Sequence, residues 1–144
     1  MTTLRGAART AAVDLLKDYG ASAGVKLQTY RARPASIMPP TAFVDVVGEA
    51  LSYPANVLPQ RTVRVQVVLV HGLFDSGEAV DQADTFVDGF VDWVTSAVHA
   101  AGGNTTIGVV EVEDDPTFVP EWMAPEKQRT YFATRIVLEV YAAG

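Results

Sequence analysis

Residues 61 to 98 carry two apolar patterns of different period, one directly after the other. The first runs from Arg61 to Val70 and alternates with period two, as expected for a β-strand that buries one face. Its alternating positions are Val63, Val65, Val67 and Leu69. The second has the 3.6-residue period of a helix, with apolar positions at Val80, Ala83, Val87, Phe90, Val91, Val94, Ala97 and Val98. We therefore predict the strongest core strand of the domain, followed by its longest helix.

The stretch between the two patterns begins with His71 and Gly72. Asp75, with Glu78 three residues later, has the spacing of a capping box and predicts the start of the helix. We interpret His71 and Gly72 as part of the turn that takes the chain from strand to helix.

Five further segments complete the predicted elements. An amphipathic helix is expected over residues 4–19, with Thr3 as its N-cap and Gly20 as its stop. Strands are expected over residues 26–30, 41–51, 105–113 and 129–141. The order is α-β-β-β-α-β-β, and strands in adjacent blocks with only two helices favour an α+β fold. We predict a single domain over residues 1–144, with a mostly antiparallel sheet of about five strands.

Composition narrows the possible functions. The net charge of −6 and the lack of any run of lysine or arginine argue against direct binding of nucleic acid. The chain has no cysteine, so disulfides, thiolate catalysis and cysteine metal sites are excluded. Its two histidines are too far apart in the sequence to suggest a metal site, so no metal or cofactor is expected. We find no signal peptide or membrane-spanning segment and expect a soluble protein made in the cytoplasm.

One set of residues resembles the parts of a small serine hydrolase. Residues 20–24, Gly-Ala-Ser-Ala-Gly, match the G-x-S-x-G pattern around Ser22, while His71 and His99 could serve an oxyanion loop and a base. The pattern, however, follows a predicted helix and precedes His71, and no histidine follows His99 where that fold places its catalytic one. We therefore expect His71 to be a strand-end residue satisfied by hydrogen bonds and His99 to lie at a helix C-terminus. The hydrolase using Ser22 and His71 stays an alternative.

Four aspartates recur at spacings of three and four residues along the predicted long helix. They are Asp81, Asp84, Asp88 and Asp92. Such a face is usually solvated, although a cation or a basic protein partner could also use it. Like charges four residues apart destabilise a helix by a few tenths of a kcal/mol per pair, which a basic neighbour would relieve.

Bulky apolar residues occupy two proline-rich segments. In the predicted loop of residues 114–128 they are Phe118, Val119, Trp122 and Met123, and in the loop of residues 31–40 they are Ile37 and Met38. Either the loops fold back as lids on the core, or these six residues form a protein–protein interface. The sequence leaves both alternatives open.

Three segments together resemble a known family. They are "SIMPPTAFVDVVGEAL", "QRTVRVQVVLV" and "TYFATRIVLEVY", and they follow an N-terminal helix and flank a long one. In this order they resemble the tail terminator, or tail completion, proteins of long-tailed bacteriophages. The resemblance covers nearly the whole chain. It lies in the order of the elements and their residue patterns, and it includes no catalytic motif.

The resemblance implies an α+β subunit without cofactor or catalytic activity. It implies a homohexameric ring at the head-proximal end of the tail tube, where the ring stops addition of tube protein and joins the head–tail connector proteins. DNA would pass through the ring without specific binding, which the net charge of −6 permits. The expected location is the tail or neck of the virion, assembled in the host cytoplasm. Alternatives are another neck protein, such as a connector or stopper, and a monomeric binding domain that uses the Trp122 loop.

Overall fold

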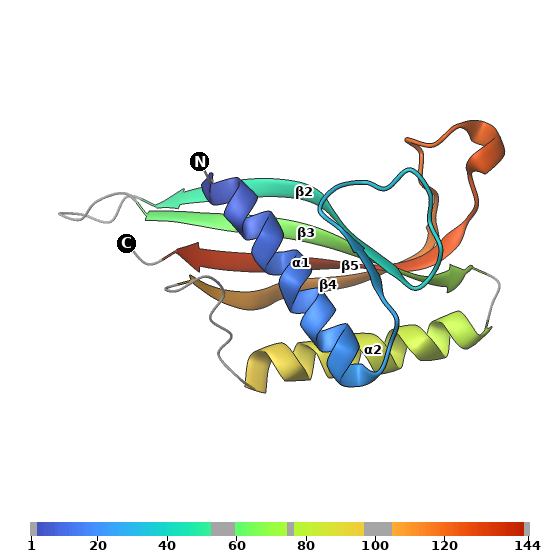
Figure 1. Cartoon of the computed structure of the whole chain (residues 1–144), viewed down its shortest axis with the longest axis horizontal. Helices are drawn as coiled ribbons and strands as arrows, with labels where there is room; N and C mark the ends of the chain where they lie inside the picture. Colours follow the sequence, from blue (N-terminus) through green and yellow to red (C-terminus); the bar gives the residue numbers. More distant parts are fainter. Residues whose placement is uncertain (1–2, 53–59, 75–76, 97–104, 143–144) are drawn as a thin grey trace.

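A computed structural model describes residues 3–52, 60–74, 77–96 and 105–142 of the chain. Two helices, α1 (Leu4–Ala23) and α2 (Gly77–Ser96), accompany the strands β1 (Gln28–Tyr30), β2 (Thr41–Ser52), β3 (Gln60–Leu73), β4 (Thr105–Phe118) and β5 (Tyr131–Ala142). A short 3-10 helix, η1 (Pro125–Lys127), precedes β5. The predicted α+β class and the order α-β-β-β-α-β-β are confirmed (Figure 1).

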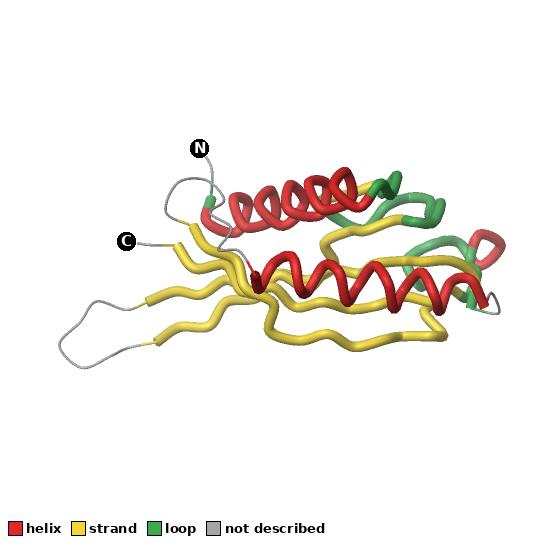
Figure 2. The backbone as a smooth tube through the Cα atoms, turned by 90° about the horizontal axis from the view of Figure 1, so that it is seen from below, coloured by secondary structure: helices red, strands yellow, loops and turns green. Residues whose placement is uncertain are grey.

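The five strands form one sheet in the order β1-β2-β3-β5-β4. β1 is parallel to β2, and every other neighbouring pair is antiparallel. Both helices lie on the same face of this sheet (Figure 2). α1 contacts β1, β2 and β3, whereas α2 contacts β3, β4 and β5, so each helix covers a different half of the sheet.

The main core lies between the helices and the sheet. The predicted alternation in β3 is confirmed, because Val63, Val65, Val67 and Leu69 all point into this core and are fully buried. Tyr19 of α1 packs edge-on against two rings of α2, with ring centroids 4.9 Å from Phe86 and 5.5 Å from Phe90. A side chain at Gly89 would collide with the Tyr19 hydroxyl, so this glycine allows the two helices to approach.

A second, smaller core lies on the opposite face of the sheet. It is made of Phe43, Val68, Val70, Phe118, Tyr131 and Ala133, with Tyr30, Ile37 and Trp122 packed against it. Neither α1 nor α2 covers this face, and the loops after β1 and after β4 cover it instead. Both faces of β3 are therefore buried near its C-terminal end.

Several predicted boundaries were wrong. α1 continues past Gly20 to Ala23 and ends at Gly24, whose φ of 72° is the left-handed conformation that glycine adopts without strain. Thr3 does cap this helix, accepting a hydrogen bond from the Gly6 amide at 2.9 Å. β4 extends to Phe118, so the first part of the expected 114–128 loop is strand. The interpretation of His71 and Gly72 as a turn is also wrong, because both lie within β3.

The remaining differences are small. The strand expected over 26–30 is limited to Gln28–Tyr30. Three residues of the predicted long helix lie outside the described residues: the capping residue Asp75, and Ala97 and Val98 at the other end. Among the described helices, none is both long and apolar enough to cross a membrane.

Candidate functional site

The six apolar residues of the two loops differ in exposure. Phe118 and Met123 are buried, and Ile37, Val119 and Trp122 are partly buried. Met38 stands apart, with 66% of its surface exposed. The loops thus fold back as a lid on the sheet, and a contact of these residues with another protein stays a prediction, for which Met38 is the most accessible.

Trp122 holds the two loops together. Its indole Nε1 donates to the Pro34 carbonyl oxygen at 2.8 Å, which links the loop after β4 to the loop after β1. Its ring meets Phe43 of the sheet edge-on at 5.4 Å, and the Arg33 guanidinium lies over it at 5.0 Å. Arg33 in turn pairs with Asp45 of β2 at 2.6 Å. These contacts make Trp122 a structural anchor of the isolated chain.

His71 occupies a bulge near the end of β3. The pairing of β3 with β5 passes from Val70↔Ala133 to Gly72↔Phe132, so His71 is the extra residue. Its Nε2 lies 3.0 Å from the Thr134 hydroxyl, which itself donates to Asp114 at 3.0 Å. Because a hydroxyl has one proton to give, Thr134 must accept from a protonated Nε2 of His71.

The environment of His71 keeps it neutral. Burial lowers its pKa to about 4, and the nearby Asp114 carboxylate opposes the shift only in part. The expectation that His71 is a strand-end residue satisfied by hydrogen bonds is confirmed.

A cavity of about 540 Å³ lies beside His71, between the C-terminal end of α1 and the first half of α2. Apolar side chains such as Leu27, Leu69 and Phe86 supply much of its wall. Ser22 is exposed in the last turn of α1 and is absent from the residues that line this cavity. The structure therefore does not bring Ser22 and His71 together, and His99 lies outside the described residues.

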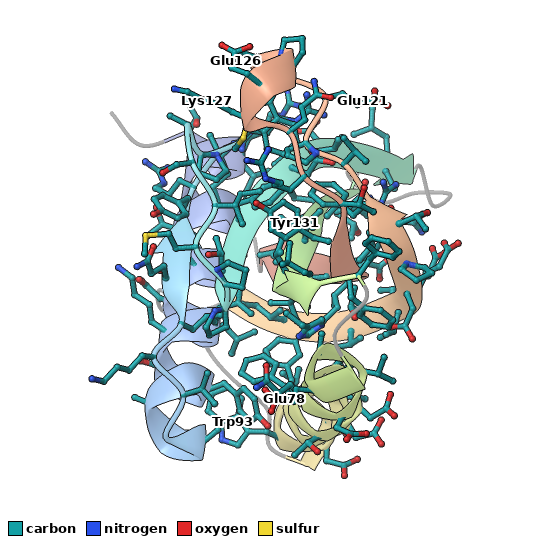
Figure 3. All side chains as sticks on the ribbon, turned by 90° about the vertical axis from the view of Figure 1, so that its right-hand side faces the viewer. Glu78, Trp93, Glu121, Glu126, Lys127 and Tyr131 are labelled. Carbon is teal, nitrogen blue, oxygen red and sulfur yellow. The ribbon has the colours of Figure 1, made fainter. Side chains whose placement is uncertain are left out.

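The four aspartates of α2 lie on its exposed side. Asp81, Asp84, Asp88 and Asp92 are all exposed, and in the described parts of the chain no group of acidic or histidine side chains is arranged to hold a metal ion. Asp92 has one electrostatic effect on the core, since its charge adds to burial in raising the pKa of Tyr19. Figure 3 shows α2, marked by Glu78, at the opposite end of the molecule from η1, marked by Glu126 and Lys127.

The two edges of the sheet were not among the predicted sites. The outer edge of β4 is unpaired in the sheet, and this strand carries Glu111, Glu113, Asp114 and Asp115. At the other edge, β1 pairs with Thr41–Phe43, and beyond Phe43 no strand among the described residues pairs with the outer side of β2. Alternation alone does not reveal which strand lies at an edge, because edges depend on the order of strands in space.

Comparison with known proteins adds no assignment. A scan against models of protein families finds no match for this chain, and a search of curated proteins finds none either. The residues of the chain itself are therefore the basis for assigning a function.

Proposed function

We propose that this protein is a structural subunit of a phage tail, the tail terminator, which acts as a homo-oligomeric ring. Supporting this are the resemblance in the order of elements and the α+β architecture that the resemblance implies. In this proposal the ring closes the head-proximal end of the tail tube, binds the tube protein on one side and the head connector on the other, and lets DNA pass.

The observation that carries the proposal is the open edge at β4. This strand is 14 residues long, is unpaired on its outer side and exposes 49% of Val110 and 41% of Val112. Exposed backbone donors and acceptors recruit other strands, and the acidic residues, Pro116 and two register shifts of β4 limit such pairing to a complementary partner. In a closed ring every copy covers the edge of its neighbour, so no such edge stays open.

Another neck protein, such as a connector or stopper, would also form a ring, and location separates the two. Tails and heads that assemble separately should be purified and labelled with antibody against this chain. A terminator places the label on one end of each isolated tail. Label on the heads alone supports the connector instead, and label on neither excludes a virion role.

A further inference from the structure

Positive and negative charges are segregated along the chain. Between Arg64 and Lys127 there is no lysine or arginine, yet this interval holds twelve of the 17 acidic residues. In contrast, six of the 11 basic residues fall within the first 33 positions, where Asp14 and Asp18 are the only acidic ones.

The fold turns this separation in sequence into a separation in space. The acid-rich elements α2 and β4 lie along one side of the molecule, and β2 with the N-terminal end of α1 lies along the other, while α1 crosses the sheet so that its C-terminal end reaches α2 (Figure 1). We call the outer side of β4 with the exposed side of α2 the acidic edge. The basic edge is the N-terminal half of α1 together with the outer side of β1 and β2.

The basic edge holds a cluster of three arginines that lack acidic partners in the described part of the chain. Arg5 donates to the Val47 carbonyl at 2.7 Å, Arg31 to the Gly6 carbonyl at 3.0 Å, and Arg9 to the Arg31 carbonyl at 2.9 Å. All three guanidinium groups are thus held by backbone oxygens, so their orientation is fixed while their charge stays uncompensated. Arg5 also marks the open edge of β2, since Val47 belongs to that strand.

The acidic edge has an excess of negative charge, because Arg135, which pairs with Asp115 and lies opposite Glu113, is the only basic residue in the described parts of α2, β4 and β5. Glu111 and Glu113 are exposed on β4, and neither forms an ion pair with any residue that the structure describes. The aspartates of α2 add negative charge on the helix-covered face of the sheet, whereas Glu111 and Glu113 lie on the opposite face; the aspartates also repel one another along the helix. β2 carries Asp45 and Glu49 and β5 carries Arg135, so each edge is mixed, but the excess of charge on one edge is opposite in sign to the excess on the other.

We propose that the acidic edge of one copy docks on the basic edge of the next copy, with Glu111 and Glu113 facing the cluster of Arg5, Arg9 and Arg31. The occupant is a second copy of this chain because the two complementary surfaces lie on opposite sides of one molecule. Contact between two different surfaces repeats from copy to copy and closes into a ring when the rotation allows it. This inference rests on the proposed ring and identifies the surfaces that form it.

The test exchanges the charges of the two edges. The double variant E111K/E113K reverses the acidic edge, and R5E/R31E reverses the basic edge. The matched controls E121K/E126K and K127E/R129E make the same charge changes on exposed residues outside the two edges. Self-association is measured by sedimentation velocity and native mass spectrometry at low and high salt, and circular dichroism confirms folding.

The wild type should assemble, and salt should weaken the assembly because it screens charge. Each edge reversal should raise the concentration needed for assembly at least about tenfold, whereas the controls should not. The variant with both edges reversed should assemble again, and so should an equal mixture of the two single-edge variants. The acid-side variant removes no described hydrogen bond or ion pair, and circular dichroism checks that it folds with lysines beside Arg135, so it stays informative if R5E/R31E fails to fold.

Two results would overturn the inference. If the wild type assembles and edge reversal has no more effect than the controls, the ring exists but uses other surfaces. If the wild type stays monomeric at low salt and high concentration, the edges do not associate. Neither result decides whether the protein acts at the tail, which the labelling of isolated tails tests separately.

Discussion

At the scale of single residues, His71 shows how an apolar setting suppresses chemistry that the sequence suggests. The residue is 7% exposed, and its ring shares a hydrogen bond with Thr134 and lies beside Phe132, with ring centroids 6.1 Å apart. A buried imidazole in such surroundings binds a proton poorly. The bulge that places it there does not turn the chain, since β3 continues for two more residues.

The lowered pKa of His71 predicts a loss of stability in acid. The imidazole has a pKa of about 4 when folded and about 6.5 when unfolded, so between these values the unfolded state binds more protons. This contribution to stability is complete above pH 6.5 and is lost as the pH falls toward 4, by up to about 3 kcal/mol. Urea unfolding of wild type and H71Q at pH 7 and pH 4.5 measures it. The wild type should lose more stability than H71Q on acidification, and equal losses would contradict this reading.

Gly89 predicts a second effect on stability. G89A should destabilise the protein by about 1–3 kcal/mol, because the added methyl group collides with the Tyr19 hydroxyl. On helix propensity alone the same change would stabilise by about 1 kcal/mol. The control is G77A in the same helix, where a methyl group meets no other atom within 4 Å. Thermal unfolding of both variants, and of G89A in a Tyr19→Phe background that removes the hydroxyl, measures the effect. If G89A and G77A have the same effect on thermal stability, the two helices accommodate the added methyl group by moving apart.

At the scale of elements, the lid explains why the sheet needs helices on only one face. The loops after β1 and β4 are joined to each other through Trp122 and Pro34 and to β2 through Phe43. Proline interrupts long regular elements in both segments, while Ile37 of one loop and Trp122 of the other supply burial that a helix would otherwise provide.

Trp122 should therefore stabilise the single chain. W122A removes the indole hydrogen bond and leaves a cavity against Phe43, with an expected cost of about 3–5 kcal/mol in the free energy of unfolding. M38A, in the same lid but 66% exposed, should change stability by no more than about 0.5 kcal/mol. Urea unfolding at a concentration where the protein is monomeric compares the two. If W122A is as stable as wild type, Trp122 does not anchor the lid and is instead a candidate for contact with a protein partner.

The sequence predicts elements better than it predicts their surroundings. Alternation in β3 and the helical period of α2 survive in the structure because both elements bury one continuous face. The end of β4 was missed because Asp114, Asp115 and Pro116 resemble a turn, yet Asp115 pairs with Arg135 and Asp114 accepts from Thr134 across the sheet. Those partners lie 20 residues away in sequence, so local patterns cannot reveal them.

The candidate sites depended even more on tertiary structure. The sequence shows that six bulky apolar residues lie in proline-rich loops. Whether these residues cover the core or contact a partner depends on the position of Phe43, which belongs to a strand distant in sequence from Trp122. The acidic run of the sequence was visible only in part, as the four aspartates of α2. The structure shows why this acidic segment matters for the proposed assembly. α1, which carries Arg5 and Arg9, lies over β1, β2 and β3, whereas β4 lies at the opposite edge of the sheet.

At the scale of the whole molecule, the fold has two unlike edges and a buried core on each face of its sheet. The helices and the lid bury both faces of the sheet near its middle, and the edges carry the exposed valines and the unpaired charges. A molecule of this kind suits head-to-tail assembly better than a symmetric dimer, since a two-fold contact would set each charged edge against its like. An acidic molecule also repels DNA, which suits a ring through which DNA passes.

The length of the tail tests the proposed terminator most directly. The gene should be deleted from the genome that encodes it, and the lengths of the phage tails produced should be measured by electron microscopy. Without a terminator, tube protein continues to add at the head-proximal end, so the account predicts tails of abnormal and variable length that do not join heads. Supplying the wild-type protein should restore uniform tails. Tails of normal length after the deletion would contradict the account, whatever the oligomeric state of the purified protein.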